Sequence, residues 1–199
     1  MPFHRFILGD EGWRIQGEEV LFANPYIEVH RVELTSPVRS QSFQWTVAYR
    51  KGAVVVVPRT EDGRFLLVRQ ERVPIQASLW EFPAGQIDEG GKHSWEVICG
   101  AGRREMREET GYELGVSGEI ISLGHFFSSA GFTDEHSHLL LMSPVVPSPQ
   151  GSAHDSGEAI TEVRGFTLGE FEGMIASGEI RDANTLSAYA RMTAMGLLR

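Results

Sequence analysis

The stretch that most constrains this chain spans residues 104–112 and reads Arg-Glu-Met-Arg-Glu-Glu-Thr-Gly-Tyr. A helix turns by about 100° per residue, so Glu105, Glu108 and Glu109, at positions i, i+3 and i+4, lie on one face of it. The glycine near the end of the stretch is suited to terminate that helix. The sequence therefore predicts a helix that presents three carboxylates together near its C-terminal end.

Two interpretations of this face are open. The neighbouring arginines could pair with the glutamates, as Arg104 with Glu108 four residues later, and form a solvated ion-paired surface. Alternatively, the repulsion between like charges, which costs about 0.2–0.5 kcal/mol per pair on a helix, is offset by a bound cation. Mg²⁺ or Mn²⁺ prefers oxygen ligands and is commonly shared with substrate phosphates. The second interpretation predicts a metal site.

Residues upstream complete a longer pattern. Glu96 stands eight residues before Arg104 and Gly90 stands six before Glu96, which gives Gly-x5-Glu-x7-Arg-Glu-U-x-Glu-Glu-x-Gly-U. The bulky apolar residues U are Met106 and Tyr112. This pattern resembles the Nudix box. The resemblance implies a hydrolase of a nucleoside diphosphate linked to another moiety, with Mg²⁺ or Mn²⁺ held by the glutamates of residues 104–112.

The pattern has one irregular feature. In the family the first glycine directly follows a strand end, here Gly85, and counting from Gly85 places Gly91 at the position of the box glutamate. Surface loops absorb insertions at little cost, whereas a shift inside the helix would scramble the carboxylate face. We therefore interpret the difference as an insertion in the loop before the helix. Glu96 then keeps its place in the pattern and is expected to brace Arg104 rather than bind metal.

The composition limits the class of protein. The 199 residues, 41% hydrophobic, suffice for one large domain or a domain with a small appendage. A net charge of −9 and a pI near 5.3 argue against binding to nucleic acid. The sequence contains no run of 18 apolar residues, so no membrane partner is expected. With a single cysteine, Cys99, no intrachain disulfide can form, and we expect a cytoplasmic protein.

The hydrophobic pattern predicts antiparallel strands followed by an α/β domain. Segments between Trp13 and Leu34 alternate apolar and polar residues around a turn at Asn24. Residues 53–58 and 65–68 are apolar runs typical of strands buried on both faces. Further strands are expected at 43–50, 120–127, 139–142 and 159–166, a loop at 144–157, and helices at 168–176 and after 182. We expect a Nudix-type α/β/α sandwich around a mixed sheet at residues 46–199, with a small antiparallel β subdomain at 1–45.

The segment before the box is similar to the ADP-ribose pyrophosphatase branch of Nudix proteins, because Gln-x-Arg at 70–72 is followed by Glu-x-Pro-Ala-Gly at 81–85. Pro83 and Gly85 end a strand, which leaves the Ala84 carbonyl without a ladder partner and free to ligate a cation. Arg72 could pair with a carboxylate or a diphosphate oxygen and is expected to bind substrate, with a surface ion pair as the open alternative.

Residues 130–135, Ala-Gly-Phe-Thr-Asp-Glu, look like the Pro-Gly-Phe-x-x-Glu segment of the same branch, with Ala130 in place of proline. The resemblance implies that Phe132 and Glu135 contact the substrate. His136 and His138 follow at strand spacing and share a face. Neither a cysteine nor a third histidine accompanies them in the sequence, so this pair is not expected to hold zinc.

A water that attacks phosphorus needs a proton acceptor within about 2.6–3.2 Å. The box glutamates are expected to be occupied with metal, and the candidates after the box are Glu135, Asp155, Glu158 and Glu162. Glu158 is favoured because it ends a glycine-containing loop that can move over a diphosphate. It also precedes a strand, much as the loop glutamate does in ADP-ribose pyrophosphatases. Glu158, Glu108 and Arg104 are the expected catalytic residues.

These features predict Mg²⁺-dependent hydrolysis of the pyrophosphate bond of a nucleoside diphosphate sugar, ADP-ribose first, to AMP and ribose 5-phosphate. Another diphosphate, such as GDP-mannose or a dinucleotide, is an alternative substrate. A module that binds ADP-ribose without turning it over is an alternative of another class. The strands between Trp13 and Leu34 are too few to bury their own apolar face, so we expect a homodimer held partly by them.

Overall fold

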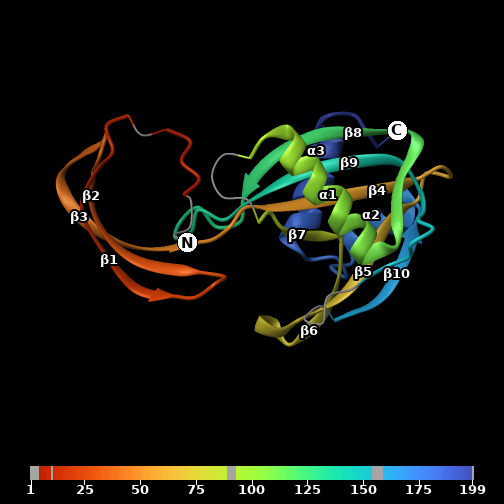
Figure 1. The fold of residues 1–199 in the computed structure, drawn as a ribbon, viewed down its shortest axis with the longest axis horizontal. Coiled ribbons are helices and arrows are strands. Elements are labelled where there is room, and N and C mark those ends of the chain that lie inside the picture. The colour runs from red at the N-terminus through yellow and green to blue at the C-terminus, as the bar shows by residue number, and fades with distance from the viewer. Residues whose placement is uncertain (1–4, 10, 89–92, 154–158, 199) are drawn as a thin grey trace.

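The computed structural model describes residues 5–9, 11–88, 93–153 and 159–198. In this part of the chain, an N-terminal sheet contains β1 (Arg14–Ala23), β2 (Glu28–Ser36) and β3 (Arg39–Tyr49), antiparallel and in that order. The turn between β1 and β2 is closed by the Asn24 side chain, which accepts the N–H groups of Tyr26 (2.8 Å) and Ile27 (2.9 Å). The antiparallel strands predicted here are confirmed, and the sheet lies to one side of the remaining fold (Figure 1).

The central sheet holds the remaining strands of the described residues: β4 (Ala53–Thr60), β5 (Phe65–Arg72), β6 (Ala77–Glu81), β7 (Ala84–Gln86), β8 (Tyr112–Phe127), β9 (His136–Pro147) and β10 (Ile160–Phe166). Its order is β10-β5-β4-β9-β8, with β6 paired to β5 and β7 to β4. A short 3-10 turn, Val73–Ile75, joins β5 to β6. Because β4 and β9 are parallel whereas the other pairs are antiparallel, the sheet is mixed, as predicted.

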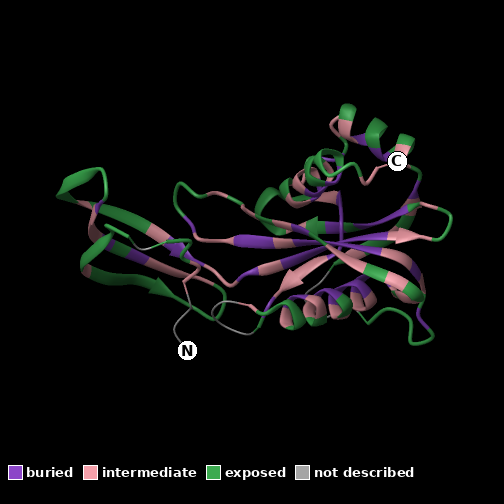
Figure 2. Ribbon diagram, turned by 90° about the horizontal axis from the view of Figure 1, so that it is seen from above, coloured by how far each residue is buried: buried purple, intermediate pink, exposed green. Residues whose placement is uncertain are grey.

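Helices cover both faces of the central sheet (Figures 1 and 2). Val54 and Val56 of β4 belong to the apolar cluster with α1 (Trp95–Thr110), whereas Val55 and Val57 belong to the cluster with α2 (Leu168–Ala176) and α3 (Ala183–Ala194). All four valines are fully buried because alternate residues of a strand point to opposite faces. The predicted α/β/α sandwich is confirmed.

Strand β9 runs further than the sequence predicted. The loop expected from Pro144 begins only after Pro147, because Val145 still pairs with Leu114 of β8 and is buried. Proline is tolerated near the end of such a ladder where its missing N–H is not needed.

The N-terminal sheet is far more exposed than the central sheet (Figure 2). Trp13, Ile15, Val20 and Phe22 each expose more than half of their surface, whereas the valines at the centre of β4 expose none. No helix in the described ranges is both long and apolar enough to cross a membrane.

Candidate active site

Helix α1 is held at both ends by its own sequence. The Ser94 side chain accepts the N–H of Val97 (3.3 Å) and caps the first turn. Gly111 ends the helix at a φ of +74°, a left-handed conformation, and its N–H donates to the carbonyl of Arg107 (2.9 Å). Met106 is fully buried against the sheet and fixes the rotation of the helix. The last two turns therefore have a defined orientation.

The predicted carboxylate face divides into two parts. Glu105 and Glu109 are buried, exposing 4% and 1% of their surfaces, whereas the Glu108 side chain remains about a quarter exposed, at 24%. Positions i and i+4 point most nearly in one direction on a helix, and i+3 lies to the side. Glu105 and Glu109 thus face the interior, and Glu108 lies at the rim.

Strand β7 lies directly against the buried carboxylates. A Cβ added to Gly85 would stand 2.0 Å from the Glu105 carboxyl carbon, so only glycine allows this approach. The N–H of Ala84 donates to Glu109 Oε2 (3.2 Å). Ala84 faces Val55 at a position where the β4–β7 ladder forms no hydrogen bonds, so its carbonyl points away from β4. The geometry thereby gathers two carboxylates and a backbone carbonyl.

Arg104 lies between the glutamates. It contacts Glu105 Oε1 (2.7 Å) and Glu108 Oε2 (3.2 Å), and it donates to the Gln86 carbonyl (3.3 Å). Arg107 approaches the other Glu108 oxygen at 3.3 Å. The ion-paired arrangement proposed from the sequence is thus present, but it coexists with the buried carboxylate face. The rim positions are ion-paired, while Glu105 and Glu109 turn toward β7.

The expectation that Glu96 braces Arg104 is wrong. Glu96 is exposed in the first turn of α1, where hydrogen bonds from its own backbone N–H and from Ser94 lower the pKa of its carboxyl group. Arg104 instead contacts Glu105, Glu108 and the Gln86 carbonyl. Gly90 and Gly91, which decide the register of the pattern, lie outside the described residues.

Arg72 is bound to Glu81, a buried carboxylate for which the sequence predicted no role. Its Nε donates to Glu81 Oε1 (2.9 Å) and its Nη2 to Glu81 Oε2. Burial raises the pKa of Glu81, while Arg72 opposes that rise. The hydrogen bond to Glu81, aided by the nearby charges of Asp182 and Glu109, raises the pKa of Arg72. Arg72 is therefore fixed at the edge of the carboxylate site.

The other predicted site residues lie away from the glutamates of α1 or outside the residues that the structure describes. Glu135, in the loop between β8 and β9, contacts Arg50 (2.6 Å) and the Ser128 hydroxyl (2.6 Å) rather than the glutamates of α1. Phe132 of the same loop is exposed, and its carbonyl accepts the N–H of Ala48 (2.8 Å). Glu162 lies within β10, as predicted. Glu158 and Asp155 lie outside the described residues, so their roles stay predictions.

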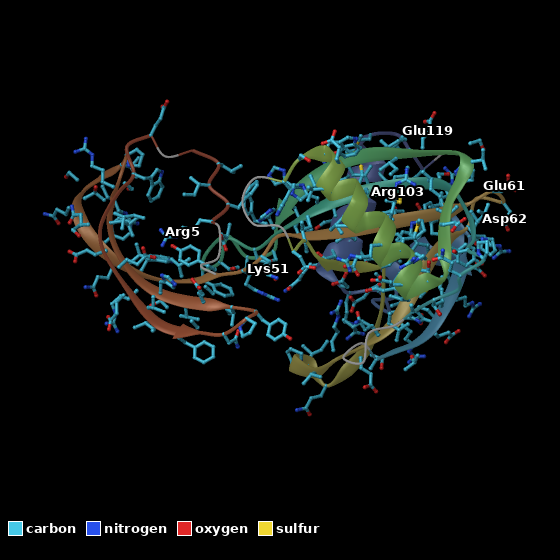
Figure 3. All side chains as sticks on the ribbon, viewed as in Figure 1. Arg5, Lys51, Glu61, Asp62, Arg103 and Glu119 are labelled. Carbon is cyan, nitrogen blue, oxygen red and sulfur yellow. The ribbon has the colours of Figure 1, made fainter. Side chains whose placement is uncertain are left out.

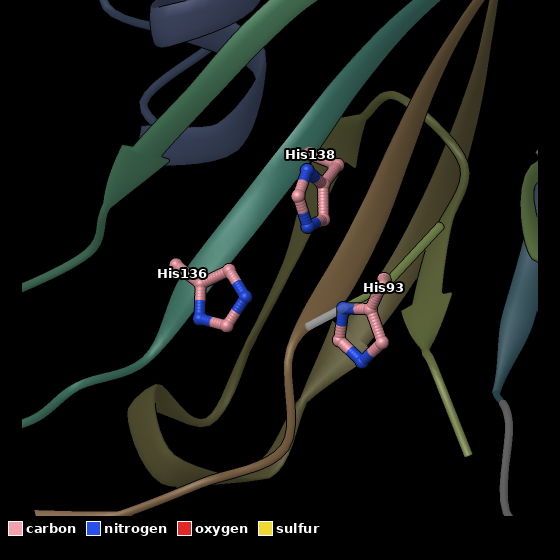
Figure 4. Close-up of side chains that lie close together, drawn as sticks. All are labelled: His93, His136 and His138. Carbon is pink, nitrogen blue, oxygen red and sulfur yellow. The ribbon is translucent and has the colours of Figure 1, made fainter. Parts of the chain in front are cut away.

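A second group of side chains lies at the starts of β9 and α1. His136 and His138 share a face of β9, as the spacing predicted, and His93, in the segment before α1, joins them (Figure 4). The expectation that a third histidine is lacking is therefore wrong. His93 is separated from His136 by more than 40 residues, and no spacing rule links them. Burial lowers the pKa of His138 to about 4 and also lowers that of His136, so both rings are neutral at pH 7.

The buried carboxylates fit a hard divalent cation. Glu105, Glu109 and the Ala84 carbonyl offer the oxygen donors that Mg²⁺ or Mn²⁺ prefers. Because Gly85 has no Cβ, β7 lies close enough to α1 for the two elements to share such an ion.

Comparison with known families gives a match to the NUDIX domain over residues 49–189. The chain belongs to the Nudix family. Its hydrolase fold and its assignment as a Nudix pyrophosphohydrolase, both expected from the sequence, are thereby confirmed.

Relatives extend over most of the Nudix chain. It is 28% identical over 173 residues to the ADP-ribose pyrophosphatase of Bacillus subtilis, covering 87% of each protein. It is 30% identical over 162 residues to the methanol dehydrogenase activator of Bacillus methanolicus, covering 81% of each. A crystal structure of an ADP compounds hydrolase superimposes with a TM-score of 0.74 at 18% identity, covering 92% of this chain and 94% of that one. Because the sequence identity is only 18%, this structural likeness shows a shared fold and nothing more.

Proposed function

We propose that this protein hydrolyses the pyrophosphate bond of ADP-ribose, with Mg²⁺ as cofactor, giving AMP and ribose 5-phosphate. The observation that carries the proposal is the buried pair of Glu105 and Glu109 packed against Gly85. The likeness to the Bacillus subtilis ADP-ribose pyrophosphatase over most of both chains supports this choice of substrate.

Different residues bind the cation, bind the substrate and accept a proton. Glu105, Glu108, Glu109 and the Ala84 carbonyl hold the cation, and Arg104 keeps Glu105 and Glu108 in place. A bound Mg²⁺ neutralises charge on the diphosphate and lowers the pKa of a coordinated water. Arg72, oriented by Glu81 through Nε and Nη2, binds a diphosphate oxygen with its remaining guanidinium N–H groups. Phe132 and Glu135 contact the ends of the substrate, and Glu158 accepts the proton of the attacking water.

A substrate panel tests this proposal. The purified protein is incubated with ADP-ribose, GDP-mannose and a dinucleotide such as diadenosine diphosphate, with Mg²⁺ and with chelator, and the release of phosphomonoesters is measured. We expect the highest kcat/KM with ADP-ribose and no turnover with chelator. A preference for GDP-mannose or the dinucleotide would show that ADP-ribose is not the main substrate, while the proposed pyrophosphate hydrolysis would still hold. Tight ADP-ribose binding without hydrolysis of any compound would identify a binding module.

We also propose that residues 1–45 help to form a homodimer while residues 46–199 form the hydrolase unit. The apolar side chains of β1, Val20 and Phe22 among them, are exposed, and β1 is an edge of the N-terminal sheet. Exposed apolar edge strands favour pairing with a second chain. Light scattering should give twice the chain mass at micromolar concentration, and Val20→Lys with Phe22→Lys should shift the mass toward a monomer. A monomeric wild type would overturn the dimer.

A further inference from the structure

Away from the glutamates of α1, the structure gathers the histidine cluster, which consists of His93, His136 and His138 (Figure 4). One ring nitrogen from each residue lies within 4.8 Å of the others. The rings come from the start of β9 and from the segment before α1, and in Figure 4 they surround a common point.

The chemistry of His136 is set by a backbone contact. Its Nδ1 lies 3.2 Å from the Asp134 carbonyl, which can only accept, so Nδ1 carries the proton. Nε2 is then the nitrogen with a free lone pair, and it is buried without a hydrogen-bond partner. A histidine that donates one ring N–H to a carbonyl, while its other ring nitrogen keeps a free lone pair, has the arrangement of a metal ligand.

His138 adds an independent observation. Its Nε2 is also buried and has no hydrogen-bond partner. Leaving a polar nitrogen unpaired in the interior destabilises the folded protein, because the nitrogen has lost its hydrogen bonds to water. Two such nitrogens in adjacent positions of one strand face indicate that a ligand normally satisfies them.

The backbone beneath the cluster makes room for it. A Cβ on Gly52 would stand 2.7 Å from His93 Cε1 and 2.8 Å from His136 Nε2, so a side chain there would push the rings apart. Above it, Phe6 stacks on His136 at 3.8 Å between ring centroids. The Phe6 N–H donates to the Asp134 carboxylate (3.2 Å), which fixes this cover. Figure 3 places Lys51, the neighbour of Gly52, where the N-terminal sheet meets the rest of the fold.

We propose that His93, His136 and His138 bind a transition-metal ion of the zinc class, at a site separate from the Mg²⁺ site of the hydrolase. Neutral imidazoles suit Zn²⁺, Co²⁺ and Ni²⁺, whereas Mg²⁺ prefers oxygen. A triangle of donors 4.8 Å apart has its centre about 2.8 Å from each, so each nitrogen moves inward by less than about 1 Å to reach a Zn–N distance of about 2.0–2.1 Å. The bound ion fastens the segment before α1 to β9.

The test uses the full chain after chelator treatment and dialysis, in saturating Mg²⁺ to fill the oxygen site. Zn²⁺ is titrated by calorimetry, and Co²⁺ is added separately because its visible absorption reports tetrahedral nitrogen coordination. We expect one Zn²⁺ per chain with a Kd below about 1 µM and a rise in Tm on binding. Loss of a residue that only hydrogen-bonds a metal ligand weakens metal binding by about 10–100-fold. We expect a larger loss of Zn²⁺ affinity in each of the variants His93→Ala, His136→Ala and His138→Ala, because each removes a ligand.

Two controls make the result specific. His125 lies beside His138, with ring centroids 5.9 Å apart, but is outside the cluster, so His125→Ala should keep the Zn²⁺ affinity within threefold. Glu105→Gln should also keep it. Absence of Zn²⁺ binding to the wild type, loss in Glu105→Gln, or unchanged affinity in His93→Ala would each overturn the site. If circular dichroism shows that His136→Ala or His138→Ala is unfolded, His93→Gln in the less buried segment decides the question.

Discussion

The glutamates of α1 and the histidine cluster are two donor groups assembled in opposite ways. Glu105 and Glu109 lie on one helix, where a local spacing aligns them, and β7 closes over them through Gly85. His93 lies far in the sequence from His136 and His138 of β9, and the three meet beside Gly52, which immediately precedes β4. The first group offers oxygen and the second offers neutral nitrogen, so the two should select different cations.

The largest effect is expected from Glu105→Gln or Glu109→Gln. Each change keeps the shape of the side chain and removes a buried carboxylate, so turnover of ADP-ribose should fall by more than about 10⁴-fold, through the loss of several kcal/mol of metal-dependent stabilisation. Steady-state kinetics across a range of Mg²⁺ concentrations measure this, and circular dichroism checks that the fold remains. Near wild-type kcat at moderate Mg²⁺ would show that these glutamates are not the metal ligands.

Glu158→Gln should lower kcat by about 10²–10⁴-fold with little change in Mg²⁺ affinity, which is the range for loss of a general base. The same kinetics, with Mg²⁺ binding followed by calorimetry, separate the two effects. Glu135→Gln and Asp155→Asn serve as comparison variants. A loss of less than threefold in Glu158→Gln, with a large loss in one of the others, would assign the base to that residue and leave the metal site unchanged.

Gly85→Ala tests the oxygen group through its backbone. The new Cβ would meet the Glu105 carboxyl group at 2.0 Å, so the carboxylate must move by more than an ångström. A misplacement of about 1 Å can cost about 10²-fold in rate, and kcat should fall by that order. The matched control is Gly100→Ala on α1, where a Cβ meets nothing within 4 Å. Equal activity in both variants would mean that Glu105 does not need its close contact with β7.

Gly52→Ala is the corresponding change beneath the histidine cluster, with the smallest expected effect. Its Cβ would meet the ring edges of His93 and His136, so we expect Zn²⁺ affinity to fall by about 10-fold, similar to losing an outer-shell contact. Competition between Zn²⁺ and Co²⁺ measures it, with Gly131→Ala, which meets nothing within 4 Å, as control. A loss of kcat as large as that of Gly85→Ala would show that the two groups are coupled.

The sequence by itself determined the fold class and the main helix. The apolar run at Ala53 to Pro58 became a strand buried on both faces, because such runs can be stable only inside a sheet covered on each side. The glutamate spacing placed Glu105 and Glu109 together, since helical geometry is fixed by the backbone alone. These inferences depend on neighbours within a few residues, and the sequence contains that information directly.

The tertiary structure alone decided which side chains meet across the fold. Glu81 became the partner of Arg72 through the pairing of β5 with β6, Arg104 paired with Glu105 and Glu108 rather than with Glu96, and His93 joined His136 and His138. Each outcome depends on strand register, helix length or the path of a loop. These are settled by packing of the whole core rather than by local spacing, because contacts between distant residues form only when the entire sheet has assembled.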